Sequence, residues 1–513
     1  MSRARAILYW AILVSPGLIP FICTYLPFQD WPGHVGQIGV VALLSDPGSK
    51  AAELYPVGSN FGLNIPITWP AILLHQILPS PWGSNLVLAA ALAALAPAVH
   101  RLCRAVDADP RLALFAVPLA LGKHLFAGFF ENAGALVFVP LSFATLYELR
   151  RRPDLLRALY FAAAATGLAA THGVIYLAGG GLLFLAVGLG LLKGHRRATA
   201  WSAGGLLVSA GFFLALAVAN GVKSSAGGPS TLDALIGSIL SDPRKQMFTS
   251  GWEWLFAHYR HGTLDDWLQA LWLLFLAAGF LIAVVIERRD FLRSPRFELL
   301  LVVVVTVAFF WILPEEIGPP ILWWGARQRL PAIGAVLAVP TLGAYLWARW
   351  PALFVLPAAV ALSVVVAISY DLHRFDVEEM EGFDEVLAAI PKGQRLAYAY
   401  ADSPRIREYP GYALGYFGNY YVAAKGGEVT QGLFDRHEHT PLRARKRPLP
   451  GAPWGLLAAF RFEAHAVGFE GILVLGYPER EPFSIAERKR LELVSQGGRW
   501  RYYRPAGGAP TIQ

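Results

Sequence analysis

The chain alternates long apolar segments with short polar connections that are often basic. A helix that crosses the hydrocarbon core of a membrane needs roughly 20 mostly apolar residues. The pattern therefore predicts a mainly α-helical, polytopic transmembrane bundle with about eleven spans. The predicted spans are Ile7–Tyr25, Ser84–Leu102, Leu112–Phe130, Ala133–Tyr147, Leu156–Thr171, Ile175–Leu192, Ala200–Asn220, Trp267–Ile286, Leu299–Leu313, Leu330–Leu346 and Ala352–Tyr370.

Basic residues gather in every second loop between these spans. Clusters lie at Arg101–Arg111, Arg150–Arg157, Lys193–Arg197 and Arg288–Arg296, whereas the other loops hold fewer cations in longer segments. Because cytoplasmic loops carry the excess of Lys and Arg, the N-terminus is expected inside and the C-terminus outside.

The first outer loop, residues 27–82, is too long for a simple connection between two spans. It contains the apolar segment Pro66–Leu78, which is short for a span and holds two prolines. Counting this segment as a span would also reverse the charge pattern. It is therefore expected to form a helix on the outer membrane surface.

The composition agrees with a membrane protein and excludes a single soluble globular enzyme. Hydrophobic residues make up 55% of the chain and charged residues only 16%, with a mean hydropathy of +0.45. The net charge of +8 could suggest nucleic-acid binding. However, most cations belong to the inside loops, and the basic run Arg443–Arg447 is interpreted as a solvated loop near lipid headgroups. No nucleic-acid partner is expected. Cys23 and Cys103 form neither a disulfide framework nor a metal pair.

The composition changes at Tyr370/Asp371, which divides the chain into a membrane part (1–370) and an extracytoplasmic α/β domain (371–513). Beyond this boundary, short apolar stretches alternate with Gly and Pro. The predicted helices are Phe383–Ile390 and Ile485–Val494, and the predicted strands are Arg395–Ala401, Glu428–Phe434, Gly471–Gly476 and Trp500–Tyr503.

The first outer loop opens with a candidate catalytic pair, Asp30 and His34, in the sequence Phe28-Gln29-Asp30-Trp31-Pro32-Gly33-His34. An Asp at the membrane surface can act as a general base, and burial beside Trp31 would raise its pKa. Alternatively, Asp30 caps the helix expected from Gly33 to Leu44. The two roles can coexist.

More polar residues fall at the predicted outer ends of the spans, which suggests a cavity rather than lipid-facing positions. Three of them are cations suited to an anion such as a phosphate. Alternatively, Arg327 and Arg329 only neutralise Glu315 and Glu316, and His172 is an ordinary interface residue at the end of a helix. The candidate substrate-binding residues are Lys123, His124, Glu131, Asn132, His172, Arg327 and Arg329.

Together these features resemble a GT-C type membrane glycosyltransferase, which takes sugar from a polyprenyl-phosphate carrier. The resemblance covers the whole chain at the level of architecture. It rests on Asp30 after the first span, the Pro-rich stretch Asn64–Pro70, the Arg-containing sequence Trp324–Pro331 before a late span, and the outer domain. Its short motifs are degenerate, because Trp31 replaces a second acidic residue and Asn64-Ile65-Pro66 replaces a Lys-Pro-Pro signature. No branch of the family is therefore assigned.

The resemblance implies that Asp30 is the catalytic base and that Arg327 and Arg329, with Lys123, hold the carrier phosphate. The expected reaction is inverting transfer from a polyprenyl-phosphate-linked sugar donor to a glycan, lipid or protein acceptor on the outer face. The expected location is a bacterial inner (plasma) membrane, with a cytoplasmic N-terminus and a periplasmic C-terminal domain.

No cofactor is expected, because the sequence has no spaced metal motif such as HExxH. A divalent metal bound by Asp30, His34 and Glu131 is the alternative. The competing function is a transporter, flippase or non-catalytic component that handles lipid-linked glycans. Transporters often contain repeated, glycine-broken helices, whereas Gly179-Gly180-Gly181 has no counterpart at a repeat spacing.

Overall fold

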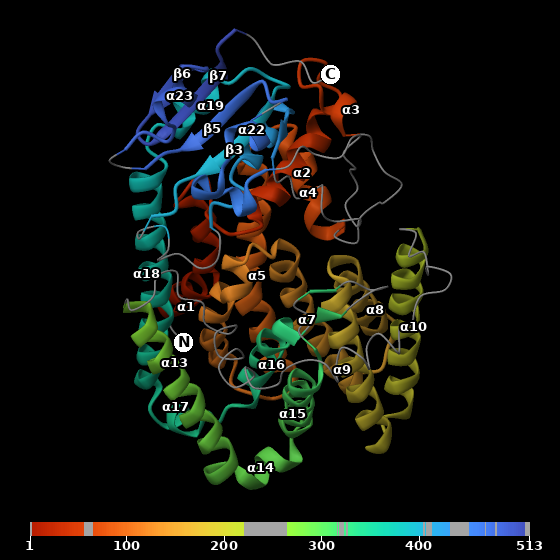
Figure 1. Cartoon of the computed structure of the whole chain (residues 1–513). Helices are drawn as coiled ribbons and strands as arrows, with labels where there is room; N and C mark the ends of the chain where they lie inside the picture. Colours follow the sequence, from red (N-terminus) through yellow and green to blue (C-terminus); the bar gives the residue numbers. More distant parts are fainter. Residues whose placement is uncertain are drawn as a thin grey trace.

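A computed structural model shows a helical bundle that carries a small domain with a five-stranded sheet at one end (Figure 1). It describes residues 3–55, 65–219, 264–314, 316–317, 323–324, 327–403, 406, 413–430, 451–466, 468–477 and 480–507.

Eight helical stretches within these residues are long and apolar enough to cross a membrane. They are α1 (Arg3–Val14) with the 3₁₀ turn Ser15–Phe21, α5 (Trp82–Ala105), α7 (Phe130–Arg151), α9 (Gly173–Leu192), α10 (Arg196–Ala219), α13 (Leu264–Leu281) with the π turn Ile282–Ile286, α15 (Pro295–Ile312), and α18 (Val355–Glu379) with the 3₁₀ turn Pro351–Phe354. The mainly α-helical, polytopic fold class is confirmed.

Three of the predicted spans differ from these eight. The first, α8 (Leu155–Thr171), is a regular apolar helix of 17 residues. The segment Leu112–Phe130 consists of two 3₁₀ turns and α6 (Lys123–Phe126), and Leu330–Leu346 is divided among α16 (Leu330–Ala338), the 3₁₀ turn Val339–Thr341 and the start of α17 (Tyr345–Arg349). Pro110 and Pro118 begin two of these 3₁₀ turns and Pro340 lies at the start of the third, where a proline lacks the N–H that a continuing helix needs. The count of eleven spans stays a prediction.

The first loop contributes three helices at the same end as the C-terminal domain, beside it in Figure 1: α2 (Trp31–Leu43), α3 (Ala51–Leu54) and α4 (Ile65–His75). At 1.5 Å per residue α4 is about 16 Å long, roughly half the hydrocarbon thickness of a bilayer. The ring nitrogen Nε2 of His75 lies 3.0 Å from Ser84 Oγ at the start of α5. This length agrees with the surface helix expected over Pro66–Leu78.

The C-terminal domain is built around a mixed sheet with the strand order β4-β3-β5-β7-β6. Strands β4 (Glu428–Val429), β3 (Arg395–Tyr400) and β5 (Gly471–Leu475) are parallel, whereas β7 (Trp500–Pro505) pairs antiparallel with β5 and with β6 (Leu491–Gly497). All of β5 and nearly all of β3 are buried, as expected for central parallel strands. The α/β composition is therefore confirmed.

The prediction of a helix over Ile485–Val494 is wrong beyond its first turn. Ser484 and Glu487 form a capping box that starts α23 (Ile485–Arg488), but Leu491 then enters β6. The antiparallel hydrogen bonds with β7 outweigh local helix propensity here. The helix α19 (Phe383–Ala389) and the strands β3, β5 and β7 lie where they were predicted. Of the predicted strand Glu428–Phe434, residues 431–434 lie outside the described residues.

The composition boundary at Tyr370/Asp371 falls inside α18. The remaining short elements connect the helices and strands described above. They are α14 (Arg288–Arg293), β1 (Glu316–Ile317), β2 (Trp323–Trp324), α21 (Asn419–Lys425), α22 (Phe462–His465) and the 3₁₀ turns Pro110–Ala116, Pro118–Leu121, Arg327–Arg329, Pro453–Gly455 and Leu457–Ala459.

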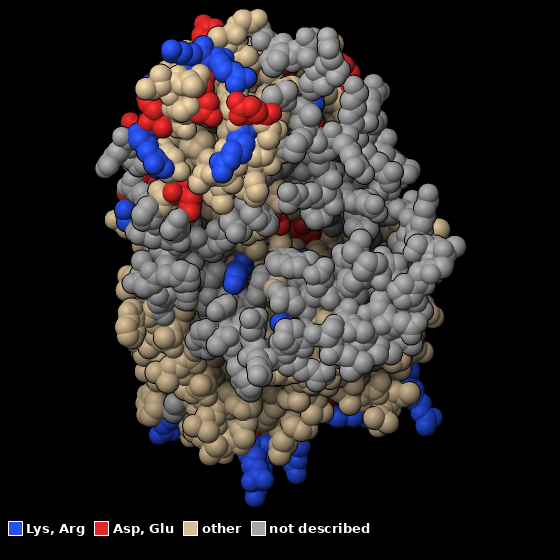
Figure 2. Space-filling model, viewed as in Figure 1, with Lys and Arg blue, Asp and Glu red and all other residues tan. Residues whose placement is uncertain are grey.

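Charges are separated along the molecule (Figure 2). Basic side chains project from the end opposite the C-terminal domain, where α14 carries Arg288, Arg289 and Arg293 (Figures 1 and 2). Mixed acidic and basic side chains cover the C-terminal domain, and the visible described surface beside the bundle is mostly uncharged. The first loop and the C-terminal domain therefore share one end, and the basic helix α14 marks the other.

Helix α2 packs closely on α21 of the C-terminal domain through glycines. A Cβ atom at Gly39 would lie 2.5 Å from the Cα atom of Ala423, and one at Gly36 would lie 3.0 Å from the Cβ atom of Asn419. Nearby, the hydroxyl of Tyr420 donates a hydrogen bond of 3.0 Å to the carbonyl oxygen of Leu26. The two backbones thus touch where a side chain would separate them.

We expect Gly39→Ala to destabilise the protein by about 1–3 kcal/mol, because the added methyl group must push α2 away from α21. The measurement is the apparent melting temperature of the detergent-solubilised protein, which should fall by several degrees. Gly181→Ala in α9 is the control, since no atom lies within 4 Å of the Cβ position there. Equal melting temperatures for the two variants would contradict this packing.

Candidate active site at the first loop

Asp30 occupies the N-cap position of α2, but its side chain makes no capping hydrogen bond within the described residues. Its backbone is in the αR region, and Trp31 and Pro32 begin the helix. An N-cap residue that caps its helix ordinarily has an extended backbone, so that its side chain reaches the N2 or N3 amide. The carboxylate of Asp30 therefore does not cap α2 and is available for another role.

The turn before α7 fixes the backbone of Asp30. The amide of Gln29 donates to the carbonyl oxygen of Phe126 at 2.9 Å, and the amide of Asp30 donates to that of Ala127 at 3.2 Å. Gly128 has a φ of +77°, and a Cβ atom there would lie 2.4 Å from the amide nitrogen of Trp31. Only glycine combines this left-handed backbone with such a close approach.

His34 and Glu131 form a polar contact between α2 and α7. The ring nitrogen Nδ1 of His34 lies 3.2 Å from Oε1 of Glu131, and both side chains are largely buried. The amide of His34 donates to the carbonyl oxygen of Asp30 at 3.2 Å, so the two predicted catalytic residues lie on one helical turn. The ring of Trp31 packs edge-on against Phe130, with 4.9 Å between centroids.

Arg329 adds a cation to this group from a different part of the chain. Its Nε donates to Oδ1 of buried Asn132 at 3.3 Å, and its guanidinium lies 4.7 Å from the ring centroid of Phe129. Burial lowers the pKa of Arg329 to about 10, while the charges of Glu131 and Asp30 oppose this shift. The guanidinium therefore remains charged at neutral pH.

These groups set the acidity of Asp30. Burial raises the pKa of its carboxyl group to about 6, with a further increase from Glu131 and opposing decreases from His34 and Arg329. A base with a pKa near the working pH is the type that proton transfer requires. Asp30 is largely ionised at pH 7 and can accept a proton at little cost.

His172 also lies close to this group, at the N-cap of α9. Its Nδ1 accepts a hydrogen bond of 3.4 Å from the amide of Ile175. Burial lowers the pKa of His172 well below its usual value, and the charges of Arg329 and His34 act in the same direction. The ring is thus neutral and also serves as a helix cap.

The structure brings together six of the nine predicted site residues, which we call the Asp30 cluster. Its members are Asp30, His34, Glu131, Asn132, His172 and Arg329.

The other three candidates lie on neighbouring short elements, and their roles stay predictions. Lys123 and His124 begin α6, and His124 is buried without a hydrogen bond to either ring nitrogen among the described residues. Arg327 is buried in the 3₁₀ turn that contains Arg329. The alternative that Glu315 and Glu316 neutralise the arginines concerns side chains outside the described residues.

Two contributors were not predicted, namely Gly128 and Phe129. Gly128 fits the turn against Asp30, and Phe129 supplies the aromatic face beneath Arg329. The only signal in the sequence is their position immediately before Phe130, where α7 begins.

Across the described part of the chain, no three His, Cys, Asp or Glu side chains are arranged to hold a metal ion. A divalent metal held by Asp30, His34 and Glu131 stays an alternative, and no chemical step is assigned to it.

The architecture is similar to that of solved membrane-protein structures. The chain has the fold of ArnT. Superposition on the crystal structure of ArnT from Cupriavidus metallidurans bound to undecaprenyl phosphate gives a TM-score of 0.54 with 12% sequence identity, over 100% of both chains. The apo structure of the same protein gives a TM-score of 0.51 at 12% identity, over 98% of this chain and 96% of that one. No family model and no curated protein matches the sequence. The expected GT-C type architecture is confirmed at the level of the fold.

Removing a charge from the Asp30 cluster should change the titration of Asp30 in a direction that depends on the charge. We expect Arg329→Gln to raise the pKa of Asp30 above about 6 and Glu131→Gln to lower it, because the arginine stabilises the carboxylate and the glutamate opposes it. The measurement is carbodiimide labelling of protonated Asp30 as a function of pH, followed by peptide mass spectrometry.

Asp46 is an internal reference, since its exposed carboxyl group pairs with Lys392, which holds its pKa below the usual range. A shift of Asp30 in the same direction in both variants would refute the proposed electrostatics.

Proposed function

We propose that this protein is an integral membrane glycosyltransferase that moves a sugar from a polyprenyl-phosphate carrier to an acceptor hydroxyl. The observation that carries the proposal is the Asp30 cluster, in which a carboxylate with a raised pKa lies in the field of a partly buried arginine. The ArnT fold supports the choice of carrier, because one of the two ArnT structures contains undecaprenyl phosphate.

Asp30 acts as the general base in this mechanism. The acceptor oxygen attacks the anomeric carbon of the sugar as its proton passes to the carboxylate of Asp30. Attack from the side opposite the carrier inverts the anomeric configuration. One carboxylate suffices, because the leaving group is an anionic phosphate that needs no proton, unlike the alcohol released in glycoside hydrolysis.

Arg329 stabilises the departing phosphate in this mechanism. The bond between the anomeric carbon and the phosphate oxygen breaks with both electrons on the oxygen, so negative charge increases there. A guanidinium can meet two phosphate oxygens at once, and Asn132 and Phe129 hold the side chain of Arg329. Arg327 and Lys123 are the further candidates for the same phosphate, and His34 orients Glu131 within the cluster.

The reaction is assigned to the outer face, as the charge pattern of the loops suggests. The first loop and the C-terminal domain share the end of the molecule opposite the basic α14. With the N-terminus in the cytoplasm, the Asp30 cluster faces the periplasm of a bacterial inner membrane. A glycan, lipid or protein acceptor would approach from there.

Asp30→Asn should reduce sugar transfer by at least about 10²-fold, because an amide cannot accept the proton of the acceptor. The assay supplies a panel of polyprenyl-phosphate-linked sugars to membranes that contain the protein, and mass spectrometry measures the released polyprenyl phosphate. Glu53→Gln is the matched control, since it removes an exposed carboxylate from the same loop. Unchanged activity in a well-expressed Asp30→Asn protein would exclude Asp30 as the base.

The same assay in detergent separates an enzyme from a transporter or flippase. Turnover by the purified protein needs no closed compartment, whereas transport does. If the donor panel remains intact while the protein moves labelled carrier lipid across vesicles, the enzyme assignment fails.

The pH dependence follows from the raised pKa of Asp30. The base must be ionised, so transfer should rise with pH through about 6 and be about tenfold lower at pH 5 than on the plateau above pH 7. Initial rates at donor concentrations well below KM report the ionisation of the donor-free protein, and measuring them on protein shown to stay folded from pH 5 to 8 tests this. A rate that is flat across this range would contradict ionisation of Asp30 as the controlling step.

A further inference from the structure

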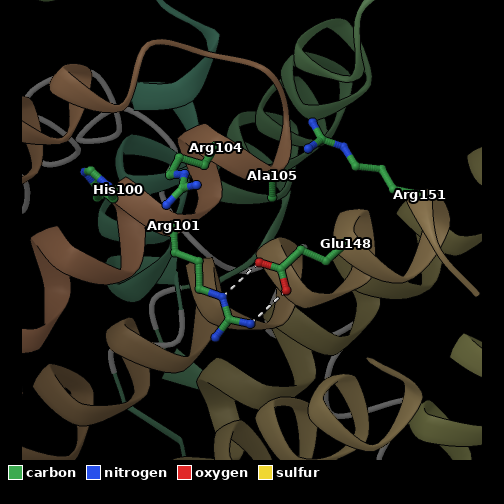
Figure 3. Close-up of a pocket in the computed structure, with 6 residues that line it drawn as sticks. All are labelled: His100, Arg101, Arg104, Ala105, Glu148 and Arg151. Atoms are coloured by element: carbon green, nitrogen blue, oxygen red, sulfur yellow. Dashed lines mark hydrogen bonds and ion pairs between the residues drawn. The ribbon is translucent and has the colours of Figure 1, made fainter. Parts of the chain in front are cut away.

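A second polar site lies at the opposite ends of α5 and α7 from the Asp30 cluster. It is a cavity of about 380 Å³ (Figure 3). Arg104 and Arg151 approach it from different helices, and Arg101 lies beneath them with its guanidinium turned toward Glu148. The lining residues are His100, Arg101, Arg104, Ala105, Glu148 and Arg151.

The charges around this cavity leave one cation without a counter-charge. Arg101 makes a two-pronged ion pair with Glu148, with Nε–Oε1 and Nη2–Oε2 distances of 2.9 and 2.7 Å. Arg151 pairs with Asp107 at the rim, at 2.6 Å. Arg104 is exposed, and no hydrogen bond or ion pair to it occurs among the residues described. A ligand with a single negative charge would balance the site.

The cavity also lies at the depth of lipid headgroups. It is at the last turns of two candidate membrane spans, α5 and α7. Trp10 stacks near His100, with 4.9 Å between ring centroids, and the hydroxyl of Tyr9 lies 2.8 Å from Nδ1 of the same His. Trp10 is exposed whereas Tyr9 is buried, and an exposed Trp next to arginines is typical of the membrane–water interface. A ligand that reaches this cavity can therefore come directly from the bilayer.

We propose that this cavity binds the phosphodiester headgroup of an anionic phospholipid. A phosphodiester carries one negative charge, which matches the single unbalanced cation, and its two free oxygens can accept hydrogen bonds from a guanidinium. Leu156 and Leu159 are exposed on α8, the helix that also places Tyr160 close to Arg101, and offer an apolar surface for the acyl chains. The site is independent of the transferase reaction proposed for the other end of the molecule.

The test is native mass spectrometry of the full-length protein in a neutral detergent, titrated with phosphatidylglycerol. We expect a bound lipid whose affinity falls about fivefold in Arg104→Gln, in line with the attraction of one interfacial cation. Arg289→Gln in α14 is the matched control, because it removes an exposed arginine from the same basic end, and it should bind lipid like the unmodified protein.

Two further arms identify the source of the phosphate. Phosphatidylcholine, which has no net charge, and inorganic phosphate should both fail to displace phosphatidylglycerol at equal concentration. Equal loss of lipid in Arg104→Gln and Arg289→Gln would overturn the proposal, because attraction would then follow total charge rather than this cavity. Displacement by inorganic phosphate would overturn the assignment to a lipid.

Discussion

The arrangement of the Asp30 cluster depends on backbone contacts that only glycine permits. Gly36 and Gly39 let α2 touch α21 of the C-terminal domain, and Gly128 lets the turn before α7 touch the backbone of Asp30 and Trp31. Interiors pack densely, so a single methyl group at such a contact must move a whole helix. Asp30 is thus held from both sides, by the membrane bundle and by the C-terminal domain, which gives that domain a part in the geometry of the Asp30 cluster.

The electrostatics of the cluster follow from the same close packing. Two carboxyl groups, Asp30 and Glu131, lie near one arginine, so the positive charge of Arg329 does not dominate the cluster. The pKa of Asp30 is therefore set chiefly by burial. Binding an anionic carrier phosphate to Arg329 would shift this balance further toward protonation of Asp30. In the proposed mechanism, donor binding at Arg329 would therefore be coupled to proton acceptance by Asp30.

Much of the membrane part of the fold could be predicted from the sequence, because a membrane requires long apolar segments and biases the distribution of Lys and Arg among the loops. The spans of α5, α7 and α9 and the strands β3 and β5 follow directly from those patterns. The interruptions in Leu112–Phe130 could not be predicted in this way, because an apolar composition is the same for a continuous helix and for the 3₁₀ turns that bring the chain back to Asp30. Likewise, local helix signals at Ser484 and Glu487 gave no warning of the hairpin that follows. Tertiary pairing, rather than composition, decides such places.

The glycine contact between α2 and α21 has a consequence for the history of the protein. Gly39 and Ala423 are far apart in the chain, yet a Cβ atom at Gly39 would have room only if the backbone at Ala423 moved. Across diverging relatives, bulk gained at one should be matched by a change at the other, so the two positions should vary as a pair. The first loop and the C-terminal domain would then change together in evolution. Exchanging only one of them between relatives would disrupt the contact between α2 and α21.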